Sequence, residues 1–128
     1  MGALVREEGL SLELVISSDA LRARQTAEAM AHAARYRGQI LLDPRLYHAN
    51  VGDMLNVLRT VVETDIGTVM MVGHNPGLEE LVARLTGNHE ELPTAALAQI
   101  ALRVDRWSDI NARTRGTLVG LWRPKELR

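Results

Sequence analysis

The stretch TVMMVGHNPGLEEL, from Thr68 to Leu81, decides the fold class of this sequence. It opens with a short apolar run typical of a buried strand and closes with residues at the spacing of an amphipathic helix. Asn75 is the expected helix cap and Pro76 the expected first helical residue. A strand followed at once by a helix is a unit of α/β folds, and His74 lies in the break between the two.

Similar units recur along the chain. Strands are expected at 13–17, 39–43, 68–72, 97–104 and 117–123, and helices at 3–8, from Ser18 to about Tyr36, at 51–64, and from Asn75 to Gly87. This alternation predicts one domain, residues 1–128, built as a three-layer α/β/α sandwich with a mostly parallel sheet. No helix of clear length separates the last two strands, so one pairing is expected to be antiparallel.

Composition excludes several classes of function. The 128 residues are 46% apolar and 24% charged, as is usual for a globular domain. A net charge of −1 gives no general field for nucleic acid or a membrane surface, and no apolar run approaches the length of a bilayer. The absence of cysteine removes disulfides, thiolate catalysis and most structural zinc sites, and it fits a cytoplasmic protein.

Two expected strand ends carry reactive side chains, and ligands of open α/β sheets bind at such ends. One is SSDALRARQT, residues 17–26, and the other is VGHNPG, residues 72–77. Arg22 is expected in the first turn of a helix capped by Ser18, where a cation opposes the helix dipole at a cost of roughly 0.3–1 kcal/mol. A bound phosphate would reverse that sign. The alternative is a solvated arginine that leans towards acidic neighbours.

His74 also has two interpretations. It is either a structural histidine satisfied by a backbone carbonyl, or an acid, base or phosphate ligand near neutral pH. The strand-end location favours chemistry, as does the Asn-Pro-Gly turn, which directs the N–H groups of the next helix to the same space. His32, His48 and His89 are scattered, so we expect neither a metal nor a cofactor. Nucleotide P-loop, Rossmann and nucleophile-elbow motifs are all absent from the sequence.

Together the two segments resemble the histidine phosphatase (phosphoglycerate mutase-like) superfamily, and most closely its SixA-type phosphohistidine phosphatases. SSDALRARQTAE at 17–28 is similar to the family's Ser-Ser-Pro-x-x-Arg-x-x-Gln-Thr-Ala segment, with Asp19 where proline is common. VGHNPGLEELV at 72–82 is similar to the segment of the family's second pocket histidine. LYHA at 46–49 and LPTAALA at 92–98 also resemble that branch, so the resemblance covers nearly the whole chain.

This resemblance implies a mechanism in which phosphate sits between two histidines and two arginines. One histidine attacks phosphorus, and water then hydrolyses the phosphohistidine intermediate. By residue match, Arg22 is one phosphate-binding arginine, and His74 is the second histidine, which stabilises charge in the transition state. Ser18 and Asn75 are further pocket candidates. His48 lies near the position of the family's acid glutamate, and we expect it to be a loop residue. The implied substrate is a phosphorylated protein or another phosphomonoester.

One family motif is absent. The nucleophile belongs to an Arg-His-Gly or Arg-His-Ala motif at the end of the family's first strand, and this sequence contains no Arg-His pair. The chain starts where the family's first helix should be under way, so we expect an N-terminally incomplete domain that lacks its central strand and is inactive by itself. Two alternatives are a non-catalytic module that binds phosphate or phosphohistidine, and a small-molecule phosphomonoesterase of the same superfamily.

Overall fold

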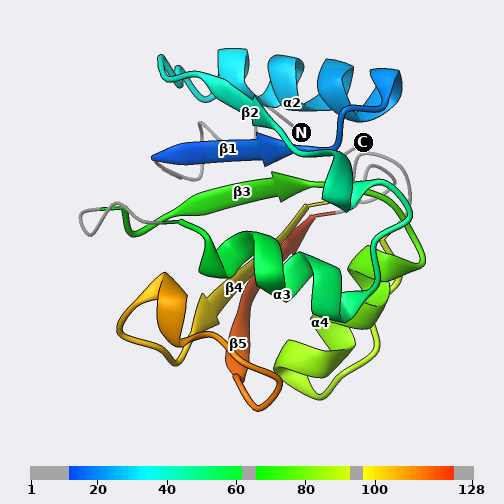
Figure 1. The fold of residues 1–128 in the computed structure, drawn as a ribbon, viewed down its shortest axis with the longest axis vertical. Helices are drawn as coiled ribbons and strands as arrows, with labels where there is room; N and C mark the ends of the chain where they lie inside the picture. Colours follow the sequence, from blue (N-terminus) through cyan, green and yellow to red (C-terminus); the bar gives the residue numbers. More distant parts are fainter. Residues whose placement is uncertain (1–11, 62–65, 93–96, 123–128) are drawn as a thin grey trace.

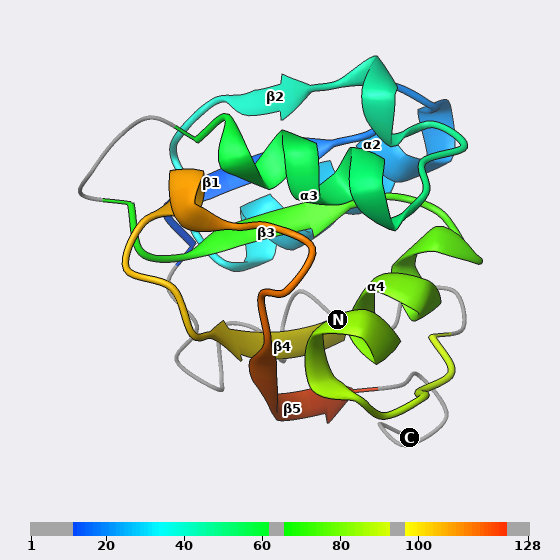
Figure 2. The same cartoon turned by 60° about the horizontal axis from the view of Figure 1, so that its bottom comes forward.

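The computed structural model describes residues 12–61, 66–92 and 97–122, drawn from two directions in Figures 1 and 2. Its strands are β1 (Leu14–Ser17), β2 (Ile40–Leu42), β3 (Val69–Val72), β4 (Leu97–Leu102) and β5 (Gly116–Trp122). Its helices are α2 (Leu21–Ala33), α3 (Val51–Arg59) and α4 (Gly77–Thr86), with 3₁₀ turns η1 (Pro44–Leu46) and η2 (Trp107–Asp109). The helix expected at 3–8 lies outside the described residues.

The strands form two sheets. Three of them pair in the order β2-β1-β3, and both pairings are parallel. In this register Ile16 lies between Leu41 of β2 and Met71 of β3. The other two, β4 and β5, form an antiparallel pair. The expectation of parallel strands with one antiparallel pairing is therefore confirmed, although the antiparallel strands are hydrogen-bonded to each other and not to the parallel set.

Helices cover both faces of the parallel sheet because successive strand residues point to opposite sides. Val15 and Met70 pack against α2, in a cluster with Ala27, Met30 and Ala31. Ile16 points the other way, into the larger cluster built mainly by α3 and α4. That cluster contains Ile16, Leu46, Met54, Leu55, Val57, Leu58, Val61, Leu81, Leu85 and Ile110. Figure 1 shows α2 on one side of the sheet and α3 on the other, so the three-layer α/β/α arrangement is confirmed.

The boundaries of α2 differ from the expectation at both ends. Its N-cap is Ala20 and not Ser18. The Ser18 hydroxyl oxygen accepts the N–H of Ala20 at 3.2 Å, so it stabilises the turn that precedes the helix. At the other end, α2 stops at Ala33 and not near Tyr36, because Arg35 adopts a left-handed conformation with φ of 60°.

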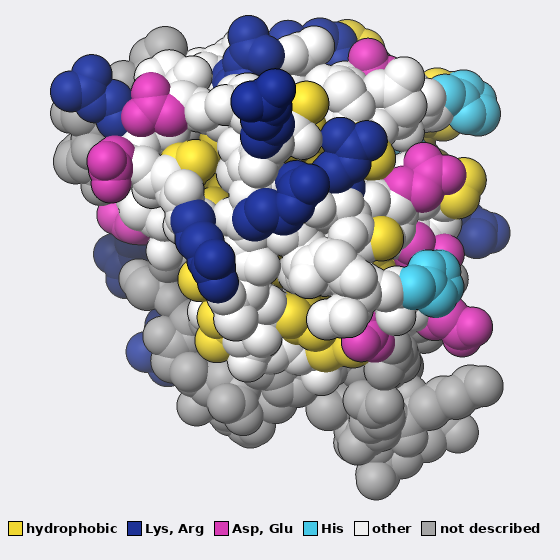
Figure 3. Space-filling view, turned by 90° about the horizontal axis from the view of Figure 1, so that it is seen from below, with side chains coloured by type: hydrophobic (Ala, Val, Ile, Leu, Met, Phe, Trp, Pro, Cys, Tyr) yellow, Lys and Arg dark blue, Asp and Glu magenta, His cyan; other side chains and the backbone are white. Residues whose placement is uncertain are grey.

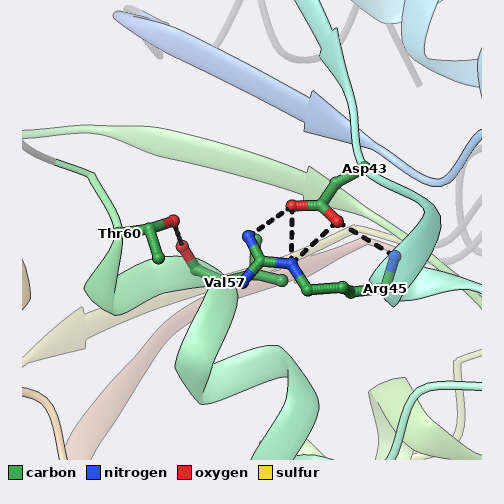
Figure 4. A network of polar contacts seen from close by, with 4 residues as sticks. All are labelled: Asp43, Arg45, Val57 and Thr60. Carbon is green, nitrogen blue, oxygen red and sulfur yellow. Dashed lines mark hydrogen bonds and ion pairs between the residues drawn. The ribbon is translucent and has the colours of Figure 1, made fainter.

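Each of the other two helices differs from the expectation at one end, since α3 begins at Val51 and Gly87 ends α4 as expected. Pro76 occupies the N-cap of α4, one position later than expected, although Asn75 Oδ1 still accepts the N–H of Glu79 at 3.2 Å. Helix α3 ends at Arg59 and not at 64. Figure 4 shows the hydroxyl of its C-cap residue Thr60 turned back to the Val57 carbonyl, at 2.6 Å. This local bond ends the helix earlier than the apolar pattern indicates.

An apolar groove of about 620 Å³ lies between the two sheets. We call it the β3–β4 groove. Its main lining side chains are Val69 and Met71 of β3, Leu78, Leu81, Val82 and Leu85 of α4, and Ile100 and Leu102 of β4. Among the described residues, β3 pairs only with β1 and β4 only with β5. Each of these two strands therefore has one backbone edge without a described strand partner.

The surface charge is unevenly spread. Figure 3 shows Lys and Arg side chains gathered in a band across one face, seen from below, at the end of the molecule that carries β4, β5 and α4. The exposed arginines between β4 and β5 are Arg103, Arg106, Arg113 and Arg115. Within the described ranges, no helix has both the length and the apolar character needed to cross a bilayer.

Candidate functional site

Two of the expected site residues, Ser18 and His74, are in direct contact. Ser18 directly follows β1, and His74 lies two residues beyond β3. These strands are parallel neighbours, so their carboxyl ends meet at one edge of the sheet. Nε2 of His74 lies 2.8 Å from Oγ of Ser18. Ser18 has no exposed surface, and its N–H donates to the Val72 carbonyl at 2.9 Å, so a rigid residue orients the imidazole.

The Ser18 hydroxyl has defined hydrogen-bonding roles. Its oxygen accepts the N–H of Ala20, so its own proton can be donated to Nε2 when the neutral His74 ring carries its proton on Nδ1. When Nε2 is protonated, the direction reverses and Nε2–H donates to the serine oxygen. Nδ1 of His74 has no hydrogen-bond partner among the described residues. This nitrogen is therefore the part of the ring available to a ligand.

Arg22 is an exposed side chain in the first turn of α2. Figure 1 shows that α2 starts at the edge of the sheet where β1 and β3 end. Asp43–Arg45 is the one ion pair between two described residues, and Arg22 has no described carboxylate as a partner. Acidic residues are also absent from the first turn of α2, so no carboxylate within that turn offsets the unfavourable helix-end cation. A bound anion would remove that penalty.

Asn75, another expected pocket residue, uses both ends of its amide to hold the chain. Its Nδ2 donates to the Leu92 carbonyl at 2.6 Å, and its Oδ1 accepts the N–H of Glu79 at 3.2 Å. The N–H of Leu92 donates in turn to Glu79 Oε2 at 2.7 Å. These three bonds tie the segment after α4 to the beginning of α4. Asn75 therefore stabilises the turn that presents His74.

Tyr47 links the remaining expected residue, His48, to the site. The ring centroids of Tyr47 and His74 are 5.4 Å apart with an interplanar angle of 86°, and those of Tyr47 and His48 are 4.2 Å apart at 64°. The segment LYHA at 46–49 includes Tyr47, but no role was expected for its ring. Two features of the sequence could have identified Tyr47. Aromatic residues are rare in this chain, which has only two Tyr, two Trp and no Phe, and Tyr47 follows a predicted strand end.

The turn that carries Tyr47 is held by its own side chains. Asp43 Oδ1 accepts the N–H of Arg45 at 2.9 Å, and Arg45 Nη2 lies 2.7 Å from Asp43 Oδ2, as Figure 4 shows. This side-chain hydrogen bond from Arg45 holds the pKa of the Asp43 carboxyl below its ordinary value. Leu46 is fully buried in the core, and the N–H of Tyr47 donates to the Pro44 carbonyl at 3.1 Å. Tyr47 is thus presented from an anchored turn.

The site therefore combines groups that suit an oxyanion. A histidine held by serine and an arginine at a helix N-terminus provide N–H donors and positive charge at one edge of the sheet. In the part of the chain that the structure describes, no three His, Asp or Glu side chains gather as they would around a metal ion.

Comparisons with solved structures show the same fold. The protein histidine phosphatase SixA, complexed with tungstate, matches with a TM-score of 0.82 over 99% of this chain and 78% of that chain, at 23% sequence identity. Proteins assigned as phosphohistidine phosphatase SixA from Nakamurella multipartitia and Agrobacterium tumefaciens match with TM-scores of 0.75 and 0.72. Their identities are 21% and 24%, over 96% of this chain and 77% and 74% of theirs. The chain has the SixA fold, as its sequence motifs predict.

Comparisons of sequence are less specific. An uncharacterized chloroplastic protein of Arabidopsis thaliana is 28% identical over 105 residues, which are 76% of this chain and 48% of that protein. This chain therefore spans about half the length of that relative. No family model matches the sequence.

Proposed function

We propose that this chain is the greater part of a SixA-type phosphohistidine phosphatase domain, which removes phosphoryl groups from histidine side chains of another protein. The observation that carries the proposal is the contact between Ser18 and His74 at the sheet edge where α2 begins, with Arg22 in the first turn of that helix. The fold supports it, since one solved SixA structure contains tungstate, which like phosphate is a tetrahedral oxyanion.

In this proposal the residues of the chain hold the phosphoryl group. Arg22 supplies charge-assisted hydrogen bonds to its oxygens, and the N–H groups at the start of α2 add to them. His74 donates through Nδ1 while Ser18 holds Nε2. These donors are in place before the reaction and stabilise the charge that develops on the oxygens in the transition state.

The proposed reaction has two steps. A nucleophilic histidine nitrogen attacks phosphorus, the bond from phosphorus to the substrate imidazole breaks, and that imidazole takes up a proton. Water then attacks the phosphohistidine formed on the enzyme, which releases inorganic phosphate and restores the nucleophile. We propose that His74 binds the phosphoryl oxygens and is not the nucleophile. A nucleophile needs neighbouring groups that position the phosphate against it.

We further propose that the nucleophile reaches the site on a strand seated in the β3–β4 groove. Because the sequence contains no Arg-His pair, the proposal assigns this strand to polypeptide other than these 128 residues. A strand that lies parallel to β3 would end at the edge where His74 lies, because the carboxyl ends of parallel strands coincide. It would also pair the edges of β3 and β4 that have no described strand partner, and cover the apolar side chains of the groove.

Phosphate binding tests the first part of the proposal. Inorganic phosphate is titrated into the chain and followed by calorimetry, for the wild type and for Arg22→Ala and His74→Ala. Loss of a hydrogen bond to a charged group should weaken binding by roughly 10-fold or more. The matched control is Arg24→Ala, which removes the same charge from an exposed position on the same helix. If Arg24→Ala weakens binding as much as Arg22→Ala, general charge and not this site binds the anion.

Catalysis is tested by a fusion that places an Arg-His-Gly strand ahead of residue 1. We expect negligible turnover of phosphohistidine by the chain alone and measurable turnover by the fusion, and His74→Ala in the fusion should reduce kcat strongly. A folded fusion that binds phosphate without hydrolysing phosphohistidine or phosphomonoesters would refute the phosphatase proposal. It would favour the second candidate, a non-catalytic phosphate-binding module, which the absence of an Arg-His pair supports.

A further inference from the structure

Tyr47 exposes a large aromatic ring beside the candidate site. The residue is 52% exposed, although its neighbour Leu46 is fully buried and the turn is anchored by Asp43 and Arg45. Burial in the core therefore does not explain the ring. Its nearest aromatic neighbours are His74 and His48, at 5.4 Å and 4.2 Å between ring centroids.

Neither histidine covers the tyrosine ring in a parallel stack. The interplanar angles are 86° to His74 and 64° to His48, and both contacts are edge-to-face. His48 takes a left-handed backbone conformation with φ of 56°, which turns the chain directly after Tyr47. An exposed ring without a stacked partner in the described structure leaves room for another planar group next to His74.

The chemistry of the phosphoryl site does not itself require an aromatic ring. Oxyanions are held by N–H donors and positive charge, which Arg22 and His74 supply. A flat apolar surface beside these groups instead suits the part of the substrate that leaves. Planar rings pack against tyrosine in offset-stacked or edge-to-face geometry, and a protonated imidazole gains a cation–π contribution as well. An alkyl leaving group gains neither.

We propose that Tyr47, supported by His48, is the surface against which the planar leaving group of the substrate packs. This inference rests on the proposed function and narrows its substrate class to phosphoryl groups carried on an aromatic ring, imidazole included, in preference to alkyl phosphates. Tyr47 is then a substrate-contacting residue that determines specificity, whereas Arg22 and His74 recognise the phosphoryl group common to all substrates.

The rival interpretation is that Tyr47 only supports the His74 ring. The two roles differ in what they do to the phosphoryl group. A supporting residue affects all phosphoryl ligands equally, whereas a stacking residue affects only ligands with a planar ring. A ratio of affinities therefore separates them.

The test measures binding of non-hydrolysable phosphonates to the 128-residue chain. The probes are phenylphosphonate, cyclohexylphosphonate of similar size without a planar ring, and inorganic phosphate. Dissociation constants come from NMR titrations that follow the ring protons of His74, which every protein in the series retains. Each probe is titrated into the wild type, Tyr47→Leu and Tyr47→Phe. Since the side chain is half exposed, these variants keep the core packing intact.

We expect the wild type to bind phenylphosphonate about 3- to 10-fold more tightly than cyclohexylphosphonate, the range expected for an aromatic pair. Tyr47→Leu should bring this ratio to about one and leave phosphate affinity unchanged, and Tyr47→Phe should preserve the ratio. An unaltered ratio in Tyr47→Leu would overturn the inference, as would an equal loss of affinity for all three probes. Failure of the wild type to bind inorganic phosphate would instead overturn the proposed function, and the inference with it.

Discussion

Replacement of Gly77 by alanine should destabilise the fold at the base of the candidate site. Gly77 is the first residue of α4, directly after the turn that presents His74. An added Cβ would overlap the carbonyl oxygen of Ala49 and lie 2.7 Å from Met54 Cε. The methionine end can move, but Ala49 precedes Asn50, the N-cap of α3, and the capping box of Asn50 and Asp53 holds the start of that helix. Only a shift of α4 away from that backbone relieves the overlap.

The magnitude follows from two opposing effects. Overpacking of this kind costs about 1–3 kcal/mol. Alanine recovers about 0.5–1 kcal/mol relative to glycine within a helix. We therefore expect a net loss of up to about 2.5 kcal/mol in the free energy of unfolding. With a urea m-value of about 2 kcal/mol per molar, the denaturation midpoint should fall by up to about 1.2 M.

Gly73→Ala is the matched control, since it changes the other glycine that flanks His74. The nearest atom to its added Cβ would be Leu78 Cδ2 at 3.6 Å, an ordinary contact. Its free energy of unfolding should stay the same or rise by up to about 1 kcal/mol, because alanine restricts the unfolded chain. The urea midpoint should therefore not fall. Equal midpoints for Gly77→Ala and Gly73→Ala, measured by circular dichroism in urea, would refute the close approach of α4 to Ala49.

Three further predictions concern the segments around the site. Leu46→Ala should lower the free energy of unfolding by about 2–5 kcal/mol in urea denaturation, because Leu46 is a fully buried side chain. Trp107→Phe removes the 2.7 Å hydrogen bond from Nε1 to the Ile66 carbonyl and should cost about 1 kcal/mol in the same assay. Asp43 has a lowered pKa when folded, so its contribution is present above its unfolded pKa of about 3.9 and is lost as the pH falls through the folded value. Asp43→Asn should therefore be less stable than the wild type at pH 6, with a small difference that disappears at low pH, as measured by thermal unfolding.

Local patterns were sufficient for the order of helices and strands but not for their ends. The strands at 39–43 and 68–72 and the helix after His74 were predicted because apolar spacing depends only on neighbouring residues. The end of α2 depends on the left-handed backbone of Arg35, and the end of α3 on the hydroxyl of Thr60. Single side-chain bonds and backbone angles of this kind leave no periodic signal.

The candidate site residues likewise divide into those that local patterns identify and those that only tertiary contacts identify. His74 and Arg22 were identifiable because their residue types, next to predicted strand ends, suit anion chemistry. The structural role of Asn75 could not be identified from the sequence, since its hydrogen-bond partner Leu92 lies 17 residues away. Tyr47 was also missed, because its importance lies in a ring contact with His74 and not in its own segment.

The sequence by itself therefore determined the class of fold and the chemistry available at two strand ends, since both depend on residue type and local spacing. Tertiary structure alone decided which of those groups meet. The parallel register of β1 with β3 places Ser18 against His74, 56 residues apart, and the anchored turn after β2 brings Tyr47 to the same ring. Such contacts arise from strand pairing and core packing between distant segments, which no local pattern records.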